Sequence, residues 1–210
     1  MRTTRVRTPL GIRIAAIAIV VGALGWYVAD RLDRRGNEHR LAAIASAIAG
    51  REVKVHCPGV LGRATKSYDT VAGSVQFDAD GVPADETDLR AAPCEELDAL
   101  AEGRRDAQLA CIERSSSCGD DVIAVAAAVD TVTHESFHLR GIADEAPTEC
   151  YSLQTMHWTA TQLGATDAQG RALATLLYQT NYQDMPDQYR SGACADGGKL
   201  DLNPADPRFP

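Results

Sequence analysis

Residues 133–139 of the chain read Thr-His-Glu-Ser-Phe-His-Leu, and this stretch decides how the remaining sequence is interpreted. Within it, His134, Glu135 and His138 form a His-Glu-x-x-His motif. Helical residues four positions apart share a face, so both imidazoles can bind one metal ion with the carboxylate beside it. The chain has only five histidines, which makes a chance match a weak explanation. The alternative is a surface helix that carries two unrelated histidines.

The residues before the motif predict a buried helix. Asp120 or Asp121 suits its start, because acidic residues in a first turn interact favourably with the helix dipole. Residues 122–129 are almost all apolar, which indicates a helix surrounded by protein. Gly141 is a natural C-terminal stop. Buried polar groups need partners, so two histidines near the end of such a helix favour a bound metal ion.

A second acidic segment follows closely and can complete a metal site. Asp144 can cap a helix on which Glu145 and Glu149 lie one turn apart. The short connection predicts an antiparallel helical hairpin that brings both glutamates towards the histidines. A catalytic zinc ion needs three protein ligands and one open position. Simple hairpin geometry places Glu149 nearer the metal than Glu145, and Cys150 or His157 are further alternatives.

The motif and the acidic segment together resemble the gluzincins, zinc metallopeptidases with His-Glu-x-x-His on one helix and a glutamate ligand on the next. In that family the ligand often begins a Glu-x-x-x-acid pattern, which residues 145–149, Glu-Ala-Pro-Thr-Glu, also show. The resemblance implies that Glu145 is the third ligand and that Glu149 holds a histidine ring in its tautomer. The longer pattern His-Glu-x-x-His-Leu-x-Gly-x-x-x-Glu-Ala is similar to a group of uncharacterised, membrane-anchored actinobacterial proteins. Only six residues separate His138 from Glu145, fewer than in large gluzincins.

The resemblance implies peptide-bond hydrolysis with Zn²⁺ as cofactor and a peptide or protein as substrate. Glu135 would be the general base towards water activated by zinc, and would pass the proton to the leaving amine. A further donor usually stabilises the tetrahedral species, and the sequence does not rank the candidates, which are Tyr151, His157, Tyr178, Tyr182 and Tyr189. The alternative function is a disulfide-stapled envelope binding or scaffold module with a structural or vestigial metal site.

The N-terminal segment predicts a membrane anchor. Residues 12–29 are apolar apart from Arg13, and a helix of this length would be about 27 Å long, close to the thickness of the hydrocarbon core. Trp26 and Tyr27 lie near its end, where interfacial aromatics are common. A small-x-small cleavage site does not follow, which favours an uncleaved transmembrane helix over a signal peptide. Residues 1–11 would then be a cytoplasmic tail.

The cysteines indicate the compartment. All six follow the apolar run, and an even count in one domain is typical of three disulfides formed in an oxidising environment. Cys111 and Cys118 bracket a serine-rich loop and are a plausible pair. The alternative is a cytoplasmic domain with reduced thiols. We therefore expect a single-pass cell-membrane protein with its C-terminal domain outside the cytoplasm. The net charge of −8 does not suggest a nucleic-acid partner.

The expected fold class is mostly α (α+β). Residues 30–50 are expected to form a linker or stalk helix, or the first helix of the domain, that ends at Gly50, and residues 51–210 the zincin-like domain. Short strands are predicted over 52–56 and 72–77, with a possible hairpin after the Asp80-Gly81 turn signal. Further helices are expected over the ranges 94–101, 104–113 and 167–182. Cys194 would staple the final loop to the domain.

Overall fold

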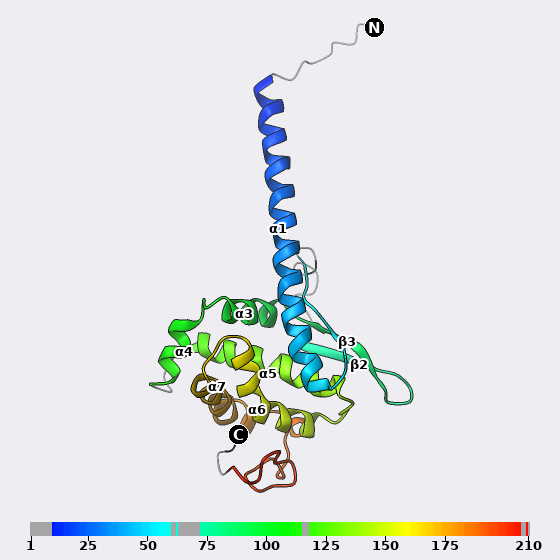
Figure 1. Ribbon diagram of the computed structural model, residues 1–210, viewed down its shortest axis with the longest axis vertical. Helices are drawn as coiled ribbons and strands as arrows, with labels where there is room; N and C mark the ends of the chain where they lie inside the picture. Colours follow the sequence, from blue (N-terminus) through cyan, green and yellow to red (C-terminus); the bar gives the residue numbers. More distant parts are fainter. Residues whose placement is uncertain (1–9, 60–61, 63–71, 115–117, 207–208, 210) are drawn as a thin grey trace. The chain divides into compact units, whose positions relative to one another are not determined.

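The computed structural model describes residues 10–59, 62, 72–114, 118–206 and 209, and the side chains among these from Ile17 onward. The chain divides into two compact units, 1–36 and 37–210. The first helix, α1 (Leu10–Ala49), contributes residues to both. The described elements are mostly helical with a small three-stranded sheet, as the sequence predicts (Figure 1).

In the first unit, α1 exposes apolar side chains to solvent, among them Ile17, Val20, Leu24 and Trp26. Searching the described residues finds no helix with a stretch long and apolar enough to cross a membrane. The predicted anchor over 12–29 begins outside the described side chains. Most of the predicted cytoplasmic tail also lies outside the described residues.

The second half of α1 belongs to the compact domain. Leu41, Ile44 and Ile48 are buried in the same hydrophobic core as the rest of the second unit. The compact unit therefore begins at Asn37, before the boundary at residue 51 that the sequence suggested. Gly50 follows α1 with a φ of 72°, a conformation that favours glycine at a helix end.

The sheet has the order β1-β3-β2. Strand β3 (Pro83–Leu89) lies in the middle, parallel to β1 (Lys54–His56) and antiparallel to β2 (Gly73–Phe77). The predicted hairpin is confirmed, and the Asp78 carboxylate accepts hydrogen bonds within its turn. Among the described strands, β2 pairs only with β3.

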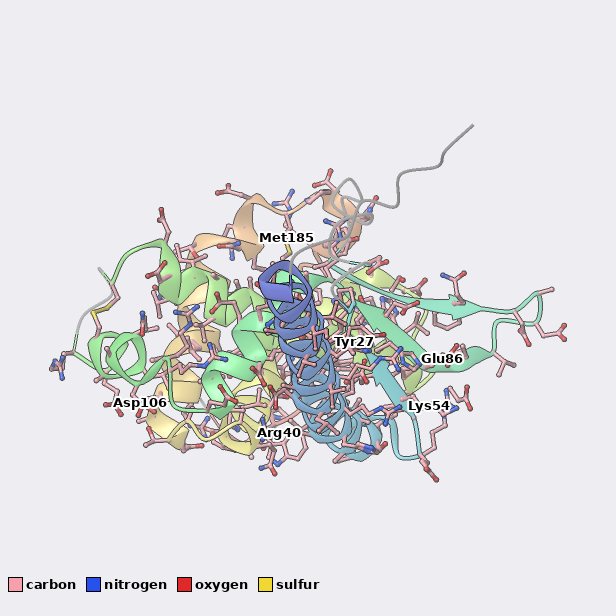
Figure 2. All side chains as sticks on the ribbon, turned by 90° about the horizontal axis from the view of Figure 1, so that it is seen from above. Tyr27, Arg40, Lys54, Glu86, Asp106 and Met185 are labelled. Atoms are coloured by element: carbon pink, nitrogen blue, oxygen red, sulfur yellow. A yellow bond between two sulfur atoms is a disulfide. The ribbon has the colours of Figure 1, made fainter. Side chains whose placement is uncertain are left out.

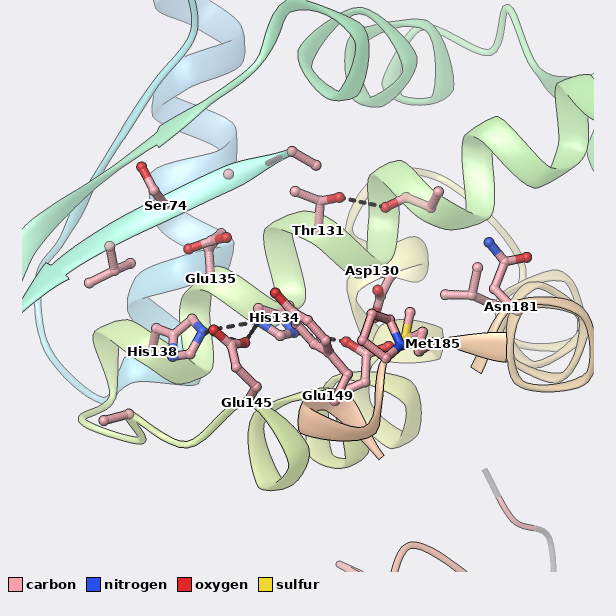
Figure 3. Close-up of a pocket in the computed structure, with 18 of the residues that line it drawn as sticks. Ser74, Asp130, Thr131, His134, Glu135, His138, Glu145, Glu149, Asn181 and Met185 are labelled. Carbon is pink, nitrogen blue, oxygen red and sulfur yellow. Dashed lines mark hydrogen bonds and ion pairs between the residues drawn. The ribbon is translucent and has the colours of Figure 1, made fainter. Parts of the chain in front are cut away.

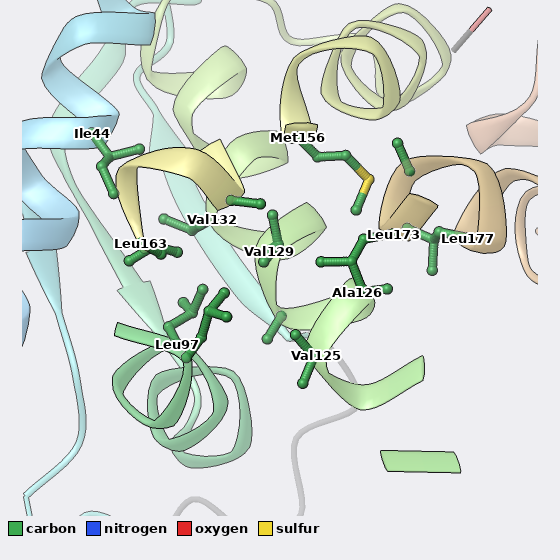
Figure 4. Close-up of a cluster of buried hydrophobic side chains, with 14 of the residues drawn as sticks. Ile44, Leu97, Val125, Ala126, Val129, Val132, Met156, Leu163, Leu173 and Leu177 are labelled. Carbon is green, nitrogen blue, oxygen red and sulfur yellow. The ribbon is translucent and has the colours of Figure 1, made fainter. Parts of the chain in front are cut away.

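Helix α5 (Asp120–Leu139) is the central element of the domain and contains the motif. It packs against β2, β3 and several other helices, among them α3 (Ala91–Ala101), α6 (Glu145–Gln162) and α7 (Asp167–Thr180) (Figure 1). Its valines meet side chains of the neighbouring helices in the core that Figure 4 shows, for example Val125, Val129 and Val132 with Leu97, Met156 and Leu173. The buried helix expected around the motif is therefore confirmed.

The remaining described elements are short. Helix α4 (Asp106–Ile112) follows α3, and two 3₁₀ turns, η1 (Tyr182–Asp184) and η2 (Asp187–Tyr189), follow α7. Charged side chains such as Lys54, Glu86 and Asp106 lie at the surface (Figure 2).

Three disulfides hold the domain together: Cys57–Cys94, Cys111–Cys118 and Cys150–Cys194. All six cysteines are paired, so both the expected number and the expected Cys111–Cys118 pair are confirmed. The Cys150–Cys194 disulfide joins α6 to the segment after α7, and η2 packs against α6. The C-terminal segment is thereby fastened beside the helix that follows the motif.

Candidate metal centre

The end of α5 is held by contacts from distant parts of the chain. Gly141 has a φ of 105° and follows the helix directly after its cap. The Arg51 guanidinium donates to the Leu139 carbonyl at 3.0 and 3.2 Å and to the Ala84 carbonyl at 2.6 Å. It therefore satisfies a carbonyl that the helix leaves unpaired and ties α5 to β3. The motif is presented from a fixed helix end.

His134, His138 and Glu145 converge on one point (Figure 3). The Nε2 atoms of His134 and His138 are 3.0 Å apart. One oxygen of Glu145, Oε2, lies 3.0 Å from Nε2 of His134 and 3.3 Å from Nε2 of His138. Both histidines are buried, whereas the Glu145 side chain remains 34% exposed. The three residues can hold a metal ion with one side turned towards solvent.

The contacts of the two Nδ1 atoms determine where the ring protons lie, and therefore why the space between the Nε2 atoms requires a cation. Nδ1 of His134 lies 2.8 Å from Oε2 of Glu149, and Nδ1 of His138 lies 2.7 Å from the carbonyl oxygen of Ile142. An ionised carboxylate and a carbonyl only accept hydrogen bonds, so both Nδ1 atoms carry the proton. The two Nε2 lone pairs and the Glu145 oxygen then face one another. Only a proton or a metal ion between them removes the repulsion.

The dimensions and donor types fit zinc. Ligands at 2.0–2.1 Å from a tetrahedral Zn²⁺ are separated from each other by about 3.3 Å, close to the three separations in the cluster. Two imidazoles and a carboxylate are a common donor set for a catalytic zinc ion, whereas Mg²⁺ and Ca²⁺ prefer oxygen ligands alone. The Nδ1 contacts orient the rings as outer groups do in metal sites.

Without a metal ion, a proton takes the central place. Burial by itself lowers the pKa of His134, but its hydrogen bonds with Glu145 and Glu149 raise that pKa to about 10. Burial lowers the pKa of His138, and the hydrogen bond with His134 lowers the pKa of Glu145. The cluster thus concentrates positive charge at His134, where a dication can replace the proton.

The structure distinguishes the two glutamates by position. Glu145, the first residue of α6, contacts both Nε2 atoms, whereas Glu149 contacts only the outer nitrogen of His134. Simple hairpin geometry was wrong in favouring Glu149, because the His134 ring lies between the two carboxylates and turns Nε2 towards the connection. The alternatives also lie elsewhere: Cys150 is in a disulfide, and His157 Nδ1 lies against the Gln154 carbonyl.

Glu135 lies beside the cluster and outside the set of ligands. Its side chain is buried, and its Oε2 has no hydrogen-bond partner among the described residues. Burial raises its pKa to about 7. A carboxyl group with this pKa can accept and return a proton near neutral pH, which is what a general base requires.

Gly73 of β2 presses directly against Glu135. A Cβ added at Gly73 would lie 2.7 Å from Cγ and 2.8 Å from Oε1 of Glu135. These distances are far inside van der Waals contact, so any side chain at residue 73 must displace the carboxylate. The sequence offered no signal for this requirement, because strand and helix are distant along the chain.

In Gly73→Ala, any reaction in which Glu135 takes part is therefore expected to slow by about tenfold or more, because misplacing a reacting group by a fraction of an ångström is costly. The content of bound metal should stay unchanged, since Gly73 is not one of the three residues that converge on the metal position. Steady-state kinetics and metal analysis of the purified variant measure both quantities. Gln76→Ala, on the same strand but outside the pocket lining, is the matched control. Full activity of Gly73→Ala would contradict the close packing.

A pocket of about 510 Å³ opens over the cluster and Glu135. Its walls come from β2, from the motif face of α5, from the start of α6 and from the segment around η2 (Figure 3). Gly73, Ser74 and Val75 form the strand side, and Met185 and Tyr189 belong to the C-terminal segment. Its size is in the range of small-molecule and peptide side-chain sites. The cluster therefore lies in an open cavity.

The structure also ranks the candidate donors. Of Tyr151, His157, Tyr178, Tyr182 and Tyr189, only Tyr189 lines this pocket, and its ring centroid lies 6.1 Å from that of His134. Sequence reasoning could not select it, because the Cys150–Cys194 disulfide and the packing of η2 bring it here.

Sequence reasoning missed Asp130, which lines the pocket one turn before His134. It is buried and accepts a hydrogen bond from Ser152 Oγ. Burial and then the charge of Glu149 raise its pKa to about 8. Asp130 lies four residues before His134 and therefore on the same helix face, and this spacing could have identified it as a site residue from the sequence.

Comparisons with protein-family models, with curated proteins and with solved structures give no significant match to the chain. The gluzincin resemblance therefore rests on the motif and the acidic segment alone, and it stays a prediction.

Proposed function

We propose that the chain is a gluzincin-type zinc peptidase that works outside the cytoplasm. The observation that carries the proposal is the convergence of His134, His138 and Glu145 at the wall of an open pocket, with Glu135 beside them. A structural zinc site is normally closed by four protein ligands. Among the described residues the cluster has three protein donors, and it adjoins a cavity, which favours catalysis over the alternative of a scaffold with a structural or vestigial metal.

His134, His138 and Glu145 would hold the zinc ion. Zinc in such a site acidifies a water molecule and polarises a carbonyl group. Glu135 accepts a proton from the attacking water and donates it to the amine that leaves. Burial raises the pKa of Tyr189, so the phenol keeps its proton and can donate a hydrogen bond to the developing oxyanion.

An extended peptide suits the shape of this site. The pocket is bordered by β2, whose outer edge is unpaired among the described strands. A substrate strand can add to such an edge through main-chain hydrogen bonds, which bind any sequence. Because Gly73 adjoins Glu135, a peptide on this edge would pass directly over the general base.

The proposed cellular location rests on observations other than the metal site. Three disulfides suit an oxidising compartment and support a domain outside the cytoplasm. The single-pass anchor with a cytoplasmic N-terminus stays a prediction, supported by the exposed apolar side chains of α1 such as Val20, Leu24 and Trp26. Carbonate extraction of membranes and protease accessibility of the C-terminal domain would test it.

Metal removal tests the proposed activity. The purified full-length protein should contain about one zinc ion per chain, the number that one three-ligand site holds. It should cleave a mixture of unstructured synthetic peptides, as read by mass spectrometry. Treatment with 1,10-phenanthroline should stop cleavage, and added Zn²⁺ should restore it. A protein that binds zinc stoichiometrically but cleaves none of the peptides would support the scaffold instead.

A further inference from the structure

Among the residues that the structure describes, the pocket lining includes four acidic side chains and no lysine or arginine. Besides Glu145, these are Asp130, Glu135 and Glu149. The zinc ion is balanced mainly by Glu145 and by Glu149 behind His134. Asp130 and Glu135 add two further carboxyl groups, and no lysine or arginine of the described lining pairs with them.

Asp130 and Glu149 form a buried acidic pair on the side of the pocket away from His138. They project from α5 and α6 into the same region (Figure 3). Asp130 is 8% exposed and Glu149 is 2% exposed. Ser152 Oγ lies 2.5 Å from Oδ1 of Asp130, and Oε2 of Glu149 faces His134.

One oxygen of this pair has no partner. Oε1 of Glu149 is buried and forms no hydrogen bond with any described residue. Leaving a carboxylate oxygen unpaired in the interior is costly, and a second carboxyl group nearby adds repulsion. A cation with several N–H donors beside the pair would offset both costs. This unpaired oxygen is a second observation, separate from the clustering of the two acids, that points to a ligand at the pair.

We propose that Asp130 and Glu149 form a subsite for a cationic group of the substrate, an ammonium or a guanidinium. The inference rests on the proposed peptidase function and adds the substrate class. Asp130 precedes His134 by four residues, about 6 Å along α5. If a peptide carbonyl lies at the metal, the side chain or amino group of the neighbouring peptide residue would lie about this far from the metal.

The rest of the subsite suits such a group. Leu177 and Met185 line the pocket and provide apolar contacts for a methylene stem, while Asn181 adds a polar side chain. The cation could be the free amino terminus of a peptide or the side chain of a lysine or arginine. Both present N–H donors and a positive charge, and the experiment below separates them.

The test uses zinc-loaded full-length protein and peptides that differ at one residue next to the scissile bond. Lysine, arginine, norleucine and glutamate are compared, each with a free and an acetylated amino terminus. We expect kcat/KM to be about 10- to 100-fold higher for peptides with a cation in the subsite, as expected for hydrogen bonds to charged groups. Acetylation removes the preference if the amino terminus binds there, and norleucine removes it if a side chain does.

Asp130→Asn should abolish most of this preference, because the amide keeps the size and can still accept from Ser152 but carries no charge. Asp121→Asn is the matched control, since it removes the same charge from an exposed position on the same helix. If Asp130→Asn fails to fold, Asn181→Lys places an ammonium in the same pocket and should also remove the preference. Unchanged preference in a folded variant would overturn the subsite.

Isothermal titration calorimetry with zinc-loaded Glu135→Gln measures peptide binding without cleavage. It therefore separates the cationic subsite from the proposed peptidase activity. Cleavage by the wild type without charge preference overturns the subsite and leaves the peptidase intact. Tighter binding of cationic peptides that depends on Asp130, but without cleavage by the wild type, supports the subsite and refutes the peptidase. A second zinc ion per chain that is lost in Asp130→Asn would also overturn the inference, because the carboxylates would then hold metal.

Discussion

Glu135→Gln is expected to keep the full zinc content and to lower kcat by about 100- to 10,000-fold, the range that general acid–base groups contribute. Glutamine has nearly the same shape, so it fits beside Gly73, but it cannot take a proton from water. The residue lies outside the His134, His138 and Glu145 cluster, so metal binding should persist. Single-turnover kinetics and metal analysis measure the two effects separately.

The matched control is Ser136→Ala on the next residue of α5. Ser136 is equally buried, but its hydroxyl donates to the Val132 carbonyl within the helix and it does not line the pocket. It should retain kcat. Retention of activity in Glu135→Gln would refute its role as general base, and loss of zinc would mean that the carboxylate belongs to the metal site.

Glu145→Gln is expected to weaken zinc binding more than Glu149→Gln does. Glu145 contacts both Nε2 atoms, so the change replaces a charged ligand with a neutral one. Glu149 contacts only Nδ1 of His134, and a glutamine oxygen can still accept that proton. Loss of such an outer contact typically costs 10- to 100-fold in metal affinity, so the effect at Glu145 should exceed this range.

Competition with a chromophoric zinc chelator gives both affinities. Glu86→Gln is the control, because Glu86 also pairs with a histidine, His56, at 3.2 Å but on the surface and outside the metal cluster. Its zinc affinity should equal that of the wild type. A larger loss for Glu149→Gln than for Glu145→Gln would transfer the third-ligand role to Glu149.

The helical periodicity was sufficient to predict how α5 presents the motif. His134 and His138 share a face because they are four residues apart, and the apolar run before them requires burial. Gly141 ends the segment because its φ of 105° suits glycine. These features depend on neighbours within a few residues, which is why sequence alone determined them. The even cysteine count predicted the number of disulfides from composition alone, and it could not predict which distant cysteines pair.

The boundary of the compact domain required packing information. An alanine-rich helix ending at Gly50 is equally compatible with a stalk and with a domain helix. Leu41 and Ile44 are buried against the core, and this contact places the end of α1 inside the domain. Burial depends on what lies opposite a helix face, and the sequence of that helix does not contain it.

The site shows the same division. The sequence by itself determined the two histidines, the nearby Glu135 and a pair of acids on the following helix. Only the tertiary structure decided that Glu145 joins the cluster while Glu149 supports it, because the choice depends on how the His134 ring is turned between them. It also brought Gly73 and Tyr189 to the pocket. The β2 strand and the Cys150–Cys194 disulfide carry them there, and long-range packing of this kind leaves no local pattern in the chain.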